Sequence, residues 1–179
     1  EGIDPVLIEA AARANGSPVG PLAAIDEISQ ETAYRNGLQM KADAEARGEP
    51  WQDRPAGELV RRMVEDFGRK GRRSGGGYYE YPEGGKKHIW PGLKQHFAPN
   101  GFKEVPFEDI KDRLVFAQCI EAVRAMQEGV IISVADGNIG SIFGIGFPPH
   151  TGGALQFVDG YEAADGRIGP AAFARRARE

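Results

Sequence analysis

The sequence has few of the residues that mark several classes of protein. It has one cysteine among 179 residues, Cys119, so no disulfide can form within the chain, and this fits a reducing compartment. Its three histidines, His88, His96 and His150, lack a cysteine or carboxylate at metal-ligand spacing, which predicts no metal site. Acidic residues (26) exceed basic ones (22), and the net charge of −4 argues against a dedicated nucleic-acid binder.

Long apolar runs are also missing. The most apolar stretch, residues 130–149, is interrupted by Asp136, Asn138, glycines and prolines, and a bilayer span needs roughly 18 or more apolar residues. This composition predicts a soluble, cytoplasmic protein. Glu1 is not a start methionine and no leader pattern follows it, so we expect a piece of a longer chain.

The usual arrangements of catalytic and nucleotide-binding residues are absent as well. No serine sits in a strand-turn-helix elbow, and Cys119 falls on an apolar helical stripe, where we expect a buried and inert thiol. The glycine-rich segment 71–77 lacks the Lys-Ser/Thr of a phosphate-binding loop, and segment 144–149 ends in proline where a dinucleotide fingerprint needs glycine. The sequence therefore predicts no catalytic, cofactor-binding or metal-binding residue of its own.

What the sequence does contain is helical periodicity. Asp4 and Pro5 form a predicted helix start, Gly16 a predicted helix end, and apolar residues recur between them at three- and four-residue spacing. The same spacing predicts an all-α fold with helices over 5–15, 22–47, 56–67, 107–129 and 133–143, and another from Gly153.

Segment 69–106 lacks this periodicity and is rich in glycine, proline and basic residues. From Arg61 to Lys103 there are ten basic and four acidic residues, so the positive charge of the chain is concentrated here. We interpret the segment as a linker or docking loop. A solvated loop is favoured over a site for phosphate groups or RNA.

The two helical blocks show a weak internal repeat. Glu1-Gly2, a helix, a turn and Gly20-Pro-Leu-Ala-Ala-Ile-Asp26 align with Glu128-Gly129, a helix, a turn and Gly153-Ala-Leu-Gln-Phe-Val-Asp159. In the second copy the Glu-Gly pair ends a long helix, so we expect the corresponding helix of the first copy to lie before Glu1. The repeat predicts a first domain over 1–68, a connecting loop over 69–106 and a truncated second domain over 107–179.

Several motifs together resemble a known family. They are the turn Gly144-Ile-Gly-Phe-Pro-Pro-His-Thr-Gly-Gly-Ala-Leu155, the helix 113–129, the run Gly75-Gly-Gly-Tyr-Tyr-Glu-Tyr81, and the opening Glu-Gly-Ile-Asp-Pro with Pro18-Val-Gly-Pro-Leu22. The chain resembles the tandem C-terminal domains of 3-hydroxyacyl-CoA dehydrogenase in the multifunctional α subunit of the fatty-acid β-oxidation complex. The resemblance implies two duplicated helical subdomains of the 6-phosphogluconate dehydrogenase C-terminal type.

The resemblance also implies what the parent protein carries. An enoyl-CoA hydratase domain and an NAD-binding Rossmann domain would precede this chain, and a His–Glu pair in the Rossmann domain would remove the hydroxyl proton. An asparagine that orients the substrate would also lie upstream. At the corresponding place in the second copy stands Asp112, so no second active site is expected.

By the same resemblance, this region closes on the acyl-CoA substrate. Ser17, Pro18 and Gly20 would lie near the domain junction, and Phe143 holds a position that is a substrate-contacting tyrosine in related α subunits. A phenyl ring can pack on an acyl chain but cannot donate a hydroxyl hydrogen bond. The basic residues of segment 69–73 are the candidates for binding CoA phosphates, with Arg72 and Arg73 chosen for test.

The expected partners are acyl-CoA, the parent's own Rossmann and hydratase domains, a thiolase subunit and a second copy of the protein. A competing hypothesis is a non-catalytic module in which the apolar stripe of 113–126 mediates dimerisation or thiolase docking. A weaker one is nucleic-acid binding by the basic loop, which would show a steep dependence of affinity on salt.

Overall fold

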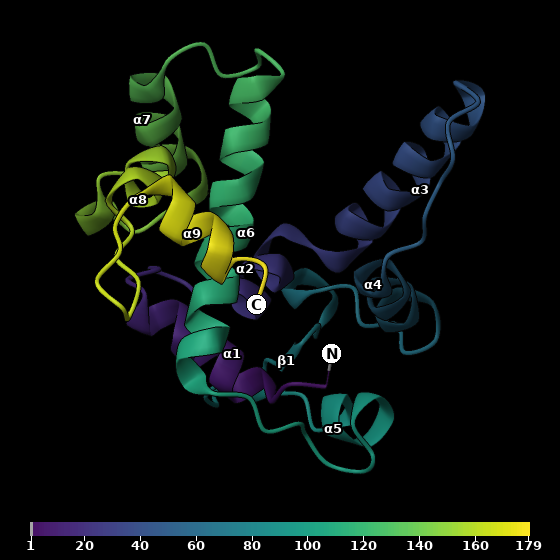
Figure 1. Ribbon diagram of the computed structural model, residues 1–179. Helices are drawn as coiled ribbons and strands as arrows, with labels where there is room; N and C mark the ends of the chain where they lie inside the picture. The colour runs from purple at the N-terminus through teal and green to yellow at the C-terminus, as the bar shows by residue number, and fades with distance from the viewer. Residues whose placement is uncertain (1) are drawn as a thin grey trace. The chain divides into compact units, whose positions relative to one another are not determined.

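The computed structural model describes residues 2–179. Over these residues the chain forms nine α-helices, two 3₁₀ turns and one pair of short antiparallel strands (Figure 1). The predicted helical fold class is confirmed, with the small hairpin as an addition. Internal packing divides the chain into unit 1, residues 2–6 and 21–103, and unit 2, residues 7–20 and 104–179. Residues 7–20, which the sequence places in the first domain, thus pack within unit 2.

Unit 1 contains three longer helices, a 3₁₀ turn, the two strands and one short helix. They are α2 (Pro21–Ile28), α3 (Gln30–Ala46), α4 (Pro55–Glu65), the 3₁₀ turn Arg72–Ser74, β1 (Tyr79–Glu80), β2 (His88–Ile89) and α5 (Gly92–Phe97). Helix α4 begins at a proline, which suits the first helical position because its missing N–H needs no acceptor there.

The single helix predicted over 22–47 is wrong, because Ser29 interrupts it. Ser29 has a φ of 99°, in the left-handed region that side chains rarely adopt, so α2 ends at Ile28 and α3 begins at Gln30. The carbonyl oxygen of Lys70 stabilises the break, accepting from the Ser29 hydroxyl at 3.0 Å and from the Gln30 N–H at 2.9 Å. The break thus depends on a tertiary contact.

Segment 69–106 forms two strands and helix α5 and contributes to the core of unit 1, so the expectation of a solvated loop is wrong. Strands β1 and β2 pair in register, with Tyr79 opposite Ile89 and Glu80 opposite His88. The Trp90 N–H donates to the Tyr78 carbonyl at 2.8 Å and extends the pairing. The core of unit 1 includes two tyrosines of this segment, and its buried members are Ala23, Met63, Tyr78, Tyr79 and Leu93.

Unit 2 contains five helices and a second 3₁₀ turn. They are α1 (Pro5–Ala14), whose first residues lie in unit 1, α6 (Phe107–Gln127), α7 (Val134–Ile145), the 3₁₀ turn Pro149–Thr151, α8 (Ala154–Gly160) and α9 (Pro170–Arg176). The predicted helices here are confirmed to within a few residues, whereas α9 was not predicted. The predicted start of α1 is also confirmed, because the Val6 N–H donates to Asp4 Oδ1 at 2.8 Å.

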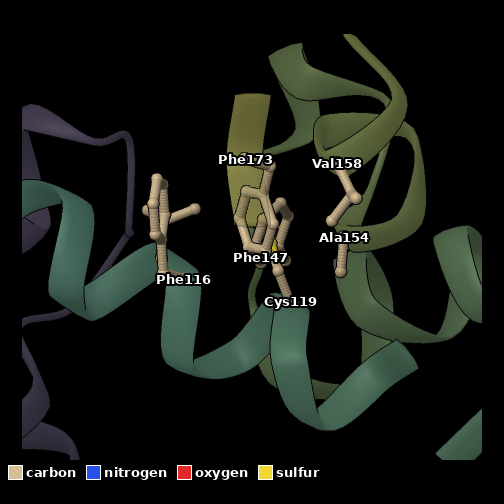
Figure 2. Packing of buried hydrophobic residues seen from close by; sticks show 7 residues of the cluster. Phe116, Cys119, Phe147, Ala154, Val158 and Phe173 are labelled. Carbon is tan, nitrogen blue, oxygen red and sulfur yellow. The ribbon is translucent and has the colours of Figure 1, made fainter. Parts of the chain in front are cut away.

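The core of unit 2 forms where α8 packs against α6, α7 and α9 (Figures 1 and 2). Figure 2 shows Phe147 and Phe173 beside Cys119 of α6, and Phe147 is 1% exposed. The buried members are Val115, Phe116, Cys119, Phe147, Ala154, Val158 and Phe173. The apolar stripe of α6 is therefore used inside unit 2, as is typical of a core helix.

Candidate functional site

A buried carboxylate organises the tyrosine-rich segment of unit 1. Asp26 is 1% exposed and accepts hydrogen bonds from the Tyr78 N–H at 2.8 Å and the Tyr79 N–H at 2.9 Å. The Tyr81 hydroxyl donates to it at 3.1 Å, and the Gln30 amide at 3.0 Å. Because these donors come from both α3 and the hairpin, Asp26 fixes the hairpin to the helices.

Glycine is required beside this carboxylate. A Cβ on Gly77 would lie 1.9 Å from Asp26 Oδ1, so no larger residue fits there. Arg69 binds the backbone of the same segment: its Nε donates to the Gly77 carbonyl at 2.6 Å, and its Nη2 donates to the Tyr79 carbonyl at 2.8 Å. Its guanidinium also lies 4.3 Å from the centre of a Trp90 ring. The glycine-tyrosine run is thus a structural motif of this unit.

The phenols around Asp26 stay protonated at neutral pH. Burial, and then the charge of Asp26, raise the pKa of Tyr78 and of Tyr81 above the ordinary value. A phenol with a raised pKa remains a hydrogen-bond donor, which suits the bond from Tyr81 to Asp26.

The predicted phosphate-binding arginines have different environments. Arg69 is turned inward, with a side chain only 14% exposed, so the structure uses it internally. Arg72 is exposed and pairs with Glu27 at 2.6 Å, and Lys70 pairs with Glu31 at 3.4 Å. Arg73 is exposed in the same 3₁₀ turn. Arg72 and Arg73 therefore remain accessible to an anionic ligand.

In unit 2, the two turns singled out by the resemblance lie against each other. A Cβ on Gly16 would contact the His150 ring at 3.2 Å and Pro148 at 3.6 Å, and one on Gly146 would contact Pro18 at 3.8 Å. Gly20 is buried against Glu9, because its Cβ would lie 2.1 Å from Glu9 Oε2. Ser17 is half-buried, and its N–H donates to the Ala12 carbonyl at 3.0 Å at the end of α1.

Phe143 lies on α7 with its side chain in solvent. The residue is 85% exposed, and Ile139 and Ile145 near it are 58% and 64% exposed. Exposed apolar residues that form one contiguous patch are typical of surfaces that bind a ligand or another protein segment. Unit 2 keeps Phe143 apart from its own core.

The remaining candidates have structural roles. Arg176 bonds Asp112 at 2.9 Å and Asp109 at 2.5 Å, which raises the pKa of Arg176 and joins α9 to α6. Asp112 is thus engaged in an ion pair with Arg176. Within residues 2–179, no group of histidine, cysteine or acidic side chains could hold a metal ion, and no helix could span a bilayer.

Cys119 is buried, and burial raises the pKa of its thiol to about 12. We predict that iodoacetamide leaves this thiol unmodified at neutral pH in the folded chain. In denaturant it should react at the rate of a free cysteine peptide. Mass spectrometry measures the extent of modification. Rapid modification of Cys119 in the folded chain would contradict its buried position.

Sequence reasoning missed an open groove in unit 1. It lies between α3 and α4 and has a volume of about 1000 Å³. Leu38, Met40, Trp51 and Val60 line it, and the Trp51 indole donates to Asp53 at 2.8 Å. The small residues that line it, such as Gly37 and Gly57, were its only sequence signal.

The comparison with protein families concerns the first part of the chain. Residues 1–81 match the sequence model of the 3-hydroxyacyl-CoA dehydrogenase C-terminal domain. The match includes α1 to α4 and ends at Tyr81, the last tyrosine bonded to Asp26. Enzymes of this family act on acyl-CoA substrates and depend on NAD. Residues 1–81 of the chain are therefore a C-terminal domain of the 3-hydroxyacyl-CoA dehydrogenase family.

Proposed function

We propose that the chain is the substrate-closing and assembly region of an NAD-dependent L-3-hydroxyacyl-CoA dehydrogenase from a cytoplasmic, bacterial-type β-oxidation complex. The family match over residues 1–81 carries this proposal. The parent would also hold the Rossmann domain that binds NAD, an enoyl-CoA hydratase domain and a site for a thiolase subunit. NAD would accept the hydride there, while this chain would bind and enclose the acyl-CoA.

The chain's own residues do not fit NAD. Segment 71–77 contains a 3₁₀ turn, and segment 144–149 begins in the last turn of α7 and continues into the loop after it. Neither segment links a strand to a helix as a dinucleotide turn does. The general base would likewise come from the Rossmann domain.

We predict no NADH formation when the purified chain is mixed with NAD and 3-hydroxybutyryl-CoA, because both the base and the cofactor site would lie upstream. Absorbance of NADH measures this directly. Turnover that persists after repurification would contradict the proposal.

The proposal includes a tandem repeat with domains over 1–68 and 107–179 and a connecting segment over 69–106. Several backbone features support it. Gly2 and Gly129 both have positive φ values, 82° and 74°, ahead of equivalent helices. Gly20 and Gly153, which precede the next helix of each copy, are both buried against a side chain or backbone of the preceding helix.

Within this proposal, the exposed ring of Phe143 packs on the acyl or pantetheine chain. Ser17, Pro18 and Gly20 shape the turn at the domain junction. The close approach of Gly20 to the buried Glu9 side chain supports this assignment, since a junction that closes on substrate needs a well-defined turn.

Arg72 and Arg73 are proposed to bind the phosphates of CoA. Charge-assisted hydrogen bonds to phosphate contribute about 1.5–3 kcal/mol, so changing both residues to alanine should weaken acyl-CoA binding about tenfold or more. Calorimetry on the variant measures this, with exposed Arg54→Ala as the matched control in the same unit. Unchanged affinity in the double variant would make the turn a connector only.

An alternative function is a non-catalytic module for dimerisation or thiolase docking. The apolar stripe of α6 is not the docking surface in this alternative, because Val123 packs against the core of unit 2. A charged residue at position 123 would therefore lower the stability of unit 2 and would not report on docking. The observation that favours this alternative is the exposed Val130 and Ile132, 75% and 83% exposed. Sedimentation velocity tests this alternative: the unmodified chain should form an oligomer, and Ile132→Asp should not.

A further inference from the structure

Two cations of unit 1 lie over neighbouring tyrosine rings of the hairpin segment. The guanidinium carbon of Arg72 is 5.6 Å from the centre of the Tyr81 ring, and Lys87 Nζ is 4.9 Å from the centre of the Tyr79 ring. The centres of the two rings are 6.4 Å apart. Because cations are attracted to the faces of aromatic rings, the tyrosines hold both charges close to the hairpin.

The pairing of β1 with β2 accounts for the position of Lys87. Tyr79 is opposite Ile89 in the antiparallel register. The same register, continued by two residues on each strand, puts Tyr81 opposite Lys87. Directly opposite residues share a face of the strands, as do residues two apart on one strand, so Lys87 lies on the face of Tyr79 and Tyr81. Asp26 fixes this face by accepting from the Tyr79 N–H and the Tyr81 hydroxyl.

The charge of Lys87 is not neutralised by a carboxylate. Lys87 is exposed, and within residues 2–179 it forms no ion pair. Arg72 does pair with Glu27, but it uses only Nη1 for this contact, so other N–H groups of its guanidinium are left for a ligand. The hairpin segment therefore offers an unpaired ammonium group and a guanidinium group with spare donors.

A ligand with two separate anionic groups fits these cations. CoA carries a diphosphate and, on its ribose, a 3′-phosphate monoester, and such monoesters are close to dianions at neutral pH. Guanidinium groups bind several phosphate oxygens at once, whereas an ammonium group is a compact point charge. Arg72 and Arg73 of the 3₁₀ turn therefore suit the diphosphate, and Lys87 suits the monoester.

We propose that Lys87 binds the 3′-phosphate of CoA and makes the chain select CoA over its 3′-dephospho form. The inference rests on the proposed function, in which Arg72 and Arg73 bind phosphates of the same ligand. Tyr79 is 6% exposed, so its ring positions the ammonium group and leaves the contact with the ligand to Lys87. Lys87 is thus a residue that determines specificity without taking part in the reaction.

Calorimetry with an acyl-CoA and with the matching 3′-dephospho acyl-CoA tests this role. The unmodified chain should bind the acyl-CoA about tenfold or more tightly than the dephospho form, and Lys87→Ala should remove this preference. Lys87→Arg should keep most of it, because arginine retains the charge and stacks on aromatic rings. Changing both Arg72 and Arg73 to alanine should weaken the binding of both ligands and leave the preference in place.

Lys86→Ala is the matched control for Lys87→Ala. It removes the same charge from the adjacent residue, which is also exposed but lies over no aromatic ring within residues 2–179. The control should retain the preference for the 3′-phosphate. Equal affinity of the unmodified chain for the two ligands, an unchanged preference in Lys87→Ala, or the same loss in Lys86→Ala would each overturn the inference.

Adenosine 3′-phosphate separates this inference from the proposed function, because it has the monoester but no acyl chain. Shifts in the amide NMR signals of residues 86–89 should saturate with it, be much weaker with adenosine, and disappear in Lys87→Ala. If this is seen but acyl-CoA does not bind, the proposed function is wrong and the monoester site holds. If acyl-CoA binds but adenosine 3′-phosphate shifts no signal at these residues, the inference is wrong and the proposed function holds.

Discussion

Replacing Asp26 with alanine should destabilise unit 1 by about 3–5 kcal/mol. The substitution leaves the Tyr78 and Tyr79 N–H groups, the Tyr81 hydroxyl and the Gln30 amide without their acceptor. Buried donors without partners carry the full cost of desolvation, and a domain of this size is stable by only about 5–15 kcal/mol. The tyrosine hairpin should therefore detach before the helices unfold.

Urea unfolding followed by tryptophan fluorescence measures this effect, because both tryptophans, Trp51 and Trp90, lie in unit 1. Asp159→Ala is the matched control, since Asp159 is the repeat counterpart of Asp26 but is exposed. The control should change stability by less than about 0.5 kcal/mol. Equal midpoints for the two variants would show that Asp26 does not anchor the hairpin.

Replacing Gly153 with alanine should destabilise unit 2 by about 3–5 kcal/mol. Gly153 has a φ of 109°, which disfavours any side chain, and an added Cβ would lie 2.5 Å from the Asn138 Cα. The collision is with backbone and cannot be relieved by rotating a side chain. The substitution should push α7 and α8 apart and loosen the core between them.

Cys119 reports on this change because it is the single cysteine and lies in the core of unit 2. Its rate of alkylation in mild denaturant should rise in Gly153→Ala. Gly160→Ala is the control, since its Cβ meets open space, and its effect should stay within about 1 kcal/mol. An unchanged alkylation rate in Gly153→Ala would contradict the close packing of α7 on α8.

Much of the helical structure follows from local signals. Asp4 and Pro5 begin α1, the Ser133 hydroxyl accepts from the Asp136 N–H at the start of α7, and the stripe of α6 predicts the core of unit 2. These features depend on residues two to four positions apart, which a sequence displays directly.

The break at Ser29 and the order of segment 69–106 could not be predicted in this way. Both depend on partners far along the chain: Lys70 for Ser29, and Asp26 for Tyr78 and Tyr79. Without those partners, a serine inside a helical pattern and a glycine-rich basic run are typical of a continuous helix and a loop. Tertiary hydrogen bonds reversed both local preferences.

The candidate site also has some features that the sequence predicts and others that depend on tertiary packing. The sequence placed Phe143 on a helix and the arginines in a turn, but burial decides their use, since Arg69 is internal while Arg72 and Arg73 face solvent. The repeat did contain a signal for Asp26, because Asp26 and Asp159 coincide in it. The signal could not show that only the first of the two is buried.

The measurement that tests the proposed function most directly is a calorimetric titration of the chain with a long-chain acyl-CoA, with free CoA as the reference. If these helices close on the substrate, acyl-CoA should bind saturably and more tightly than CoA, and Phe143→Asp should remove the difference. Phe143 is 85% exposed, so the variant should fold normally. No binding of acyl-CoA, or equal binding of acyl-CoA and CoA, would contradict the proposed role.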